Sequence, residues 1–158
     1  MQQAVHWADE VAASVLATGR EPVLSTGISP SGEIHIGNLR EVLTADAVYR
    51  ALLDRGAKPR FNYVSDNLDP LRRVYAFLYP AVYGPLVGRP LSEIPCPCGR
   101  HASYADHFLE PFLESLRTLH VHVELERADR MYKDGRMNGE IVAALSGNGA
   151  VRAGKSLA

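Results

Sequence analysis

The hydrophobic positions of this chain change their period along its first half. Residues 22–28 form a short apolar run, which is typical of a buried strand. From residue 36 to residue 52 the apolar side chains recur at helical spacing, and from 58 to 66 they alternate as in a strand. This strand–helix–strand series predicts a βαβ unit, in which two parallel strands share one sheet, and therefore an α/β fold.

Further elements flank this unit along the chain. Helical spacing predicts helices over 5–18, 103–119 and 137–146, and an alternating pattern predicts a strand over 121–126. Residues 75–100 are rich in proline and glycine, which predicts an irregular insertion rather than regular structure. We therefore expect a parallel sheet with flanking helices and an irregular insertion.

Length and composition favour a single globular domain. The chain has 158 residues, 46% hydrophobic and 22% charged, with a net charge of −1, so we expect one domain over residues 1–158. No apolar run approaches the roughly 20 residues that span a bilayer, and the N-terminus lacks the features of a secretory signal. The only cysteines, Cys96 and Cys98, are too close in sequence to join distant parts of a fold. We expect no membrane partner and a cytoplasmic location.

The segment GISPSGEIHIGN, residues 27–38, joins the first predicted strand to its helix. Glycines permit close backbone approach, and a helix N-terminus offers unpaired N–H groups and partial positive charge to a phosphate. His35 and Asn38 lie near this end, and both can donate hydrogen bonds to a group that gains negative charge in a transition state. The residues predict a nucleotide with its α-phosphate near His35. A glycine-rich turn with a capping histidine is the simpler alternative.

This segment and its surroundings resemble a known family. PSGEIHIGN, residues 30–38, is similar to the His-x-Gly-His signature of class I aminoacyl-tRNA synthetases, with asparagine in the fourth place. Together with NLREVLTADAVYRAL, DPLRRVY and ASYADHFLEPFLESL, it resembles the N-terminal catalytic segment of the class I lysyl-tRNA synthetases. The resemblance runs from about residue 6 to at least residue 144, which is nearly the whole chain.

The resemblance implies a partial Rossmann-like sheet and a two-step reaction. Lysine and ATP, with Mg²⁺, would form lysyl-adenylate, and the lysyl group would then pass to tRNA(Lys). His35 and Asn38 would be catalytic at the phosphates, and Gly37 would make room for adenine. The residues implied to bind ATP are Pro30, Ser31, Gly32, His35, Ile36, Gly37 and Asn38. Those implied to bind the amino acid are Gly27, Ser29 and Asp66, with Asp69 near the same predicted strand end.

The chains of this family are longer than this sequence. They continue into a second half of the nucleotide-binding fold, with a Lys-Met-Ser-Lys-Ser-type loop, and into a helical anticodon-binding domain, and we find neither here. Losing a preorganised donor to a developing charge typically costs about 10²–10³ in rate. We therefore expect an incomplete catalytic domain that is weak or inactive alone. A complementing chain, self-association and a gene remnant all stay open.

Two other functions fit the same residues. One is a truncated, non-catalytic paralogue that binds tRNA or a partner subunit, which a tRNA gel shift without adenylate binding would support. The other is a different nucleotidyltransferase of the same superfamily that acts on a small acid, which its substrate dependence would reveal.

Residues 149–156 also match the phosphate-loop pattern G-x-x-x-x-G-K-[ST]. A working phosphate loop lies between a strand and a helix, and only two residues follow the match. We therefore expect residues 147–158 to be a disordered tail rather than a phosphate site.

Cys96 and Cys98, together with His101 and His107, raise the question of zinc. Structural zinc ligands usually come as C-x₂₋₄-C with a second pair elsewhere, and Cys-x-Cys does not follow that spacing. From the sequence we expect no metal site.

Overall fold

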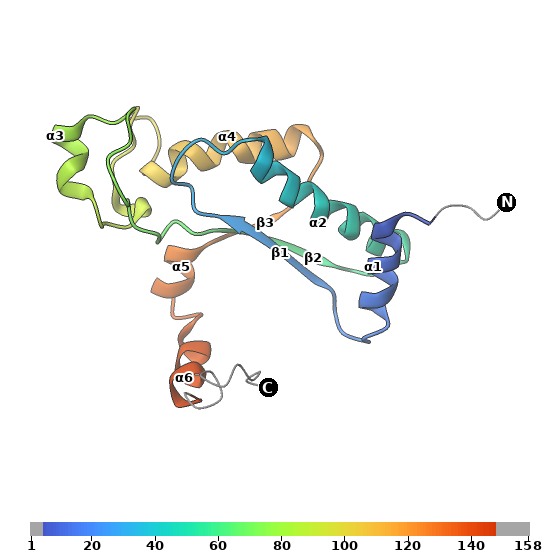
Figure 1. Ribbon diagram of the computed structural model, residues 1–158. Coiled ribbons are helices and arrows are strands. Elements are labelled where there is room, and N and C mark those ends of the chain that lie inside the picture. The colour runs from blue at the N-terminus through green and yellow to red at the C-terminus, as the bar shows by residue number, and fades with distance from the viewer. Residues whose placement is uncertain (1–4, 148–158) are drawn as a thin grey trace.

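Three parallel strands form the sheet at the centre of the fold (Figure 1). The computed structural model describes residues 5–147. β1 (Val23–Ile28), β2 (Arg60–Ser65) and β3 (Glu124–Arg127) are paired in the order β1-β2-β3, and both pairings are parallel. The predicted α/β fold with an open parallel sheet is confirmed, and the arrangement is consistent with a partial Rossmann-like fold.

Helices cover one face of this sheet. α2 (Ile36–Asp54) connects β1 to β2, and α4 (Tyr104–Thr118) precedes β3. The ring of Tyr63 in β2 lies 5.6 Å from that of Phe112 in α4, measured between centroids. Val42 of α2 belongs to the same buried cluster. Both helices therefore pack on the same side of β2.

The other helices lie at the ends of this layer. α1 (Trp7–Leu16) packs its Ala8 and Ala12 against α2. α5 (Ala128–Lys133) follows β3 directly, and α6 (Asn138–Ser146) extends away from the sheet (Figure 1). None of the helices in the described part of the chain is long and apolar enough to cross a membrane. The phosphate-loop match at 149–156 and the predicted tail after residue 147 lie outside the described residues.

The insertion between β2 and α4 has little regular structure but a core of its own. Its only helical turns within residues 75–100 are α3 (Pro80–Tyr83), η1 (Gly84–Leu86) and η2 (Leu91–Glu93). The buried residues of this core are Leu71, Leu78, Tyr83, Leu91, Ile94, Tyr104, Ala105 and Phe108. The last three belong to α4, so this helix is shared between the core of the insertion and the core on the sheet.

β1 and β2 end side by side, which positions the loops that follow them. In the parallel register Ile28 pairs with Ser65, and the Asp66 amide donates a hydrogen bond to the Ile28 carbonyl at 2.9 Å. Open parallel sheets bind ligands beyond the carboxyl ends of their strands. The loop over 29–35 and the loop over 66–69 therefore flank one region.

Gly27 is required by the pairing of β1 with β2. A Cβ at this position would lie 2.3 Å from the Val64 carbonyl oxygen, which is part of the partner strand's backbone. We predict that Gly27→Ala lowers the free energy of unfolding by about 1–3 kcal/mol, as overpacking does elsewhere. Urea denaturation measures this change. Gly32→Ala is the matched control, because nothing lies within 4 Å of a Cβ there. Equal losses in the two variants would contradict the prediction.

Candidate functional site

His35 caps the N-terminus of α2. Its Nδ1 accepts a hydrogen bond from the Gly37 amide at 3.1 Å, and its own amide donates to Asn38 Oδ1 at 3.1 Å, which completes a reciprocal capping box. Since Nδ1 is an acceptor, the neutral ring carries its proton on Nε2. The residue is exposed. The cap therefore fixes the imidazole and leaves its Nε2–H as a donor for a ligand.

Gly37 provides the space for this arrangement. A Cβ there would lie 2.9 Å from Cε1 and 3.0 Å from Nδ1 of His35. The resemblance assigned this space to adenine, and the structure places the His35 ring against the same bare backbone. The neighbouring Ile36 is 79% exposed and packs into neither core. The capping interpretation of His35 is thus compatible with the phosphate-binding one.

A cleft of about 500 Å³ opens at the carboxyl end of β1. Its lining residues are Ser25, Thr26, Gly27, Ile28, Ser29, Glu41, Val64 and Asp66. The structure therefore brings together all three residues that the resemblance assigned to the amino acid, Gly27, Ser29 and Asp66. It adds Glu41, whose Oε1 accepts a hydrogen bond from the Gly27 amide at 3.4 Å. Glu41 lies within α2, and no sequence signal separated it from a surface glutamate.

The cleft has a negative electrostatic character. Glu41 and Asp66 both line it. Burial, and then the neighbouring Asp69 carboxylate, raise the pKa of Asp66 above its usual range. A ligand with a positive charge would relieve this repulsion. The cleft therefore suits a positively charged ammonium group better than a negatively charged ligand.

Ser29 and Asp69 join the two loops beyond the strand ends. The Ser29 hydroxyl donates a hydrogen bond to Asp69 Oδ2, and the same oxygen lies 3.7 Å from Arg72 Nη2. These three residues line a second hollow of about 350 Å³, which shares Ile28 and Ser29 with the cleft. The Ser29 side chain is therefore already paired, and its hydroxyl fixes the distance between the loops.

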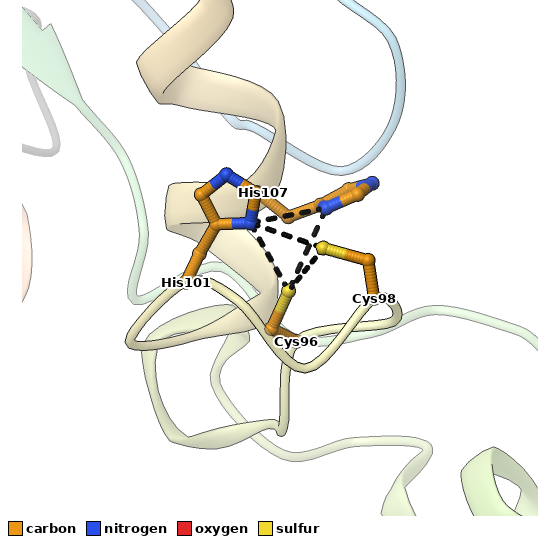
Figure 2. Close-up of side chains that lie close together, drawn as sticks. All are labelled: Cys96, Cys98, His101 and His107. Atoms are coloured by element: carbon orange, nitrogen blue, oxygen red, sulfur yellow. Dashed lines mark hydrogen bonds between the residues drawn. The ribbon is translucent and has the colours of Figure 1, made fainter.

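Four side chains converge at a separate point in the insertion (Figure 2). Cys96, Cys98 and His101 come from the loop after η2, and His107 comes from the start of α4. Their ligand atoms all lie within 4.8 Å of one another. Cys96 Sγ is 3.4 Å from Cys98 Sγ, 3.2 Å from His101 Nδ1 and 3.5 Å from His107 Nδ1. We call this group the Cys–His cluster.

Five of the six separations, at 3.2–3.5 Å, are close to those expected around a tetrahedral zinc ion. Bonds of about 2.3 Å to sulfur and about 2.0–2.1 Å to nitrogen place the ligand atoms of a tetrahedron about 3.3–3.8 Å apart. Hydrogen bonds alone explain the arrangement less well, because the Nδ1 atoms of His101 and His107 face each other at 3.4 Å and thiols are weak partners. The sequence spacing argued against zinc because it offered no second pair of ligands. The structure supplies that pair as the two histidines.

The cluster favours the thiolate form of Cys96, which a metal requires, but it also favours the protonated form of His101, whose proton a metal must displace. Burial raises the pKa of the Cys96 thiol, but hydrogen bonds with His101 and Cys98 outweigh burial and lower this pKa to about 5. The contact with Cys96 in turn raises the pKa of His101. Because zinc binds the thiolate form of cysteine, Cys96 is ready to bind at neutral pH.

The Cys–His cluster borders the loop that precedes α2. His101 and His107 line a hollow of about 420 Å³, and Glu33 and Ile34 of the loop line the same hollow. The nucleotide motif and the cluster are therefore neighbours in space, although residues 39–95 lie between them in the sequence.

Comparison with known proteins gives a family match over most of the chain. The model for tRNA synthetases class I (K) matches residues 5–153. The lysine–tRNA ligase of Methanosarcina barkeri is 57% identical over 145 residues, that of Archaeoglobus fulgidus 54% over 131, and that of Methanocaldococcus jannaschii 46% over 143. These alignments cover 92%, 83% and 89% of this chain. They span 27%, 26% and 27% of the relatives' own lengths.

Proposed function

This chain belongs to the class I lysyl-tRNA synthetase family, and we propose that it forms the ATP- and lysine-binding part of a lysine–tRNA ligase. In the proposed first step a carboxylate oxygen of lysine attacks the α-phosphorus of ATP. A carboxyl–phosphate bond forms, the bond from the α-phosphorus to the bridging oxygen breaks, and pyrophosphate leaves. Mg²⁺ accompanies the ATP.

The capped N-terminus of α2 is the observation that carries this proposal. His35 Nδ1 is held by the Gly37 amide, so the donor at Nε2 is fixed before any ligand binds. Asn38 uses its Oδ1 for the cap, which leaves its NH₂ group as a second donor. The helix end adds partial positive charge. Donors fixed in this way stabilise charge that develops on the α-phosphate without having to reorganise.

The lysine α-ammonium is proposed to bind in the cleft at the end of β1. The carboxylates of Glu41 and Asp66 supply the negative charge that an ammonium group needs. The raised pKa of Asp66 supports this proposal, because a bound cation would favour its charged form. The choice of lysine itself follows from the relatives, which are lysine–tRNA ligases.

The complete reaction extends beyond the matched stretch. That stretch spans 27% of the Methanosarcina barkeri ligase. We propose that the matched residues take part in transfer of the lysyl group to tRNA(Lys). They would do so together with the regions that the relatives have outside the matched stretch.

A structural zinc site is a second proposed function, and it concerns the insertion. It is supported by the tetrahedral spacing of the four ligand atoms in the Cys–His cluster. Bound zinc would fix the loop that carries Cys96, Cys98 and His101 to the start of α4. The insertion has few regular elements, so such a link would contribute a large share of its order.

The role of His35 in binding can be separated from its role in capping. We predict that His35→Asn keeps the free energy of unfolding within about 0.5 kcal/mol of wild type, because asparagine is a good N-cap residue, whereas His35→Ala loses about 0.5–2 kcal/mol. Both variants should bind a non-hydrolysable lysyl-adenylate analogue about 10–100-fold more weakly, since both lack Nε2–H. Titration calorimetry measures the affinities, and urea denaturation the stabilities. Wild-type affinity in His35→Asn would contradict the proposal.

Zinc binding is predicted at a ratio of one ion per chain. Native mass spectrometry of protein purified with zinc should show this ratio in the wild type and in His122→Ala, which removes an exposed histidine outside the cluster. Cys96→Ser should lose the ion because it removes the buried thiolate ligand. Chelation should lower the melting temperature of the wild type and leave that of Cys96→Ser unchanged. A wild-type chain that stays free of zinc would overturn the prediction.

A further inference from the structure

Tyr104 connects the insertion to the nucleotide loop. Its hydroxyl donates a hydrogen bond to the Ser31 carbonyl at 2.8 Å, across 73 positions in the sequence. The residue is 0% exposed. Its ring packs against Phe108, with centroids 5.1 Å apart, and against Tyr83 at 6.4 Å. Since the ring is enclosed by the core of the insertion, the position of its hydroxyl is set by that core.

The receiving loop is held by packing near its two ends, because Pro30 is buried and Ile34 packs against the core on the sheet. Residues 29–35 form no helix or strand. Within the described part of the chain, the bond from Tyr104 is the only hydrogen bond that links the backbone of residues 30–34 to another element. Burial raises the pKa of the Tyr104 hydroxyl well above its usual range, so it stays protonated and keeps donating. Between Pro30 and Ile34, the backbone of the loop is therefore tied to the rest of the fold by this tyrosine.

The same tyrosine is tied closely to the Cys–His cluster. It lies in sequence between the ligands His101 and His107, and its amide donates to the Ile94 carbonyl at 2.8 Å, two residues before Cys96. His107 and Tyr104 both lie at the start of α4, so the cluster and the Tyr104 ring share one element. The cluster and the loop also share the walls of one hollow.

We infer that Tyr104 is a positioning residue that transmits the order of the Cys–His cluster to the nucleotide loop. It acts through the Ser31 carbonyl, which holds residues 31–35 in the path that leads to His35 at the end of α2. This inference rests on the proposed function only for its effect on ligand binding. Its effect on the order of the loop is independent of what the loop binds.

Tyr104→Phe tests the inference, with Tyr83→Phe as the matched control. Both substitutions remove one buried hydroxyl that bonds to a carbonyl, but the Tyr83 hydroxyl bonds at 3.1 Å to Pro95, beside Cys96 on the cluster side, and not to the nucleotide loop. Hydrogen exchange of the zinc-loaded chains is followed by mass spectrometry, with the β2 amides as an internal reference. We expect the amides of residues 31–37 to exchange about tenfold faster in Tyr104→Phe and to stay at the wild-type rate in Tyr83→Phe.

Removal of zinc provides a second test of the inference. Chelation should accelerate exchange at residues 31–37 in the wild type and add little in Tyr104→Phe, where the connection is already lost. Equal exchange in the two tyrosine variants, or an equal response of wild type and Tyr104→Phe to chelation, would overturn the inference. Binding of the lysyl-adenylate analogue should weaken about tenfold in Tyr104→Phe. If wild type binds no analogue while the exchange pattern holds, the proposed function fails and the inference stands.

Discussion

The parallel pairing of β1 with β2 is the constraint on which the rest of the structure depends. It aligns Ile28 with Ser65, so both strands end at one level and their loops meet. It also directs Phe61 and Tyr63 to one face, where each buried ring contributes about 1.5–3 kcal/mol and where α2 and α4 pack. The close approach of the two backbones at Gly27 leaves no room for a side chain. The cleft, the capped helix and the insertion all take their positions from this pairing.

α4 connects the sheet to the insertion, because it contributes buried side chains to both cores. Its Leu109 and Phe112 pack over the sheet, whereas its Phe108 belongs to the core of the insertion. A partly buried ion pair between Asp106 and Arg127 joins the helix to the end of β3. Because a close-packed helix moves as a unit, the sheet, the cluster and the nucleotide loop share one rigid connection.

The central part of the fold could be predicted from the sequence because it is encoded locally. The βαβ pattern, the glycine-rich turn and His35 at the start of its helix all lie within about forty consecutive residues. The helical and strand periods determine such a unit almost independently of the remaining chain. The gathering of Gly27, Ser29 and Asp66 at one cleft follows from the same topology.

What the sequence could not predict depends on contacts between distant segments. His107 completes the Cys–His cluster only because the core of the insertion places the start of α4 beside the loop of Cys96. The sequence spacing between cysteine and histidine does not reveal that these two segments lie side by side. The position of Glu41 in the cleft depends on how α2 is rotated over β1. α5 was missed because it is a single short helix without an apolar period.

The sharing of α4 between two cores also limits how the protein can be divided. By chain order the insertion looks like a module that begins after β2 and ends before α4. Its physical boundary instead falls within the helix, with Tyr104 and Phe108 of the first turns in one core and Leu109 and Phe112 of the later turns in the other. An excised insertion would lack a wall of its core, and a sheet without it would expose the apolar side chains left behind. Recombination between relatives would therefore preserve both cores only if it moved the insertion and α4 as one block.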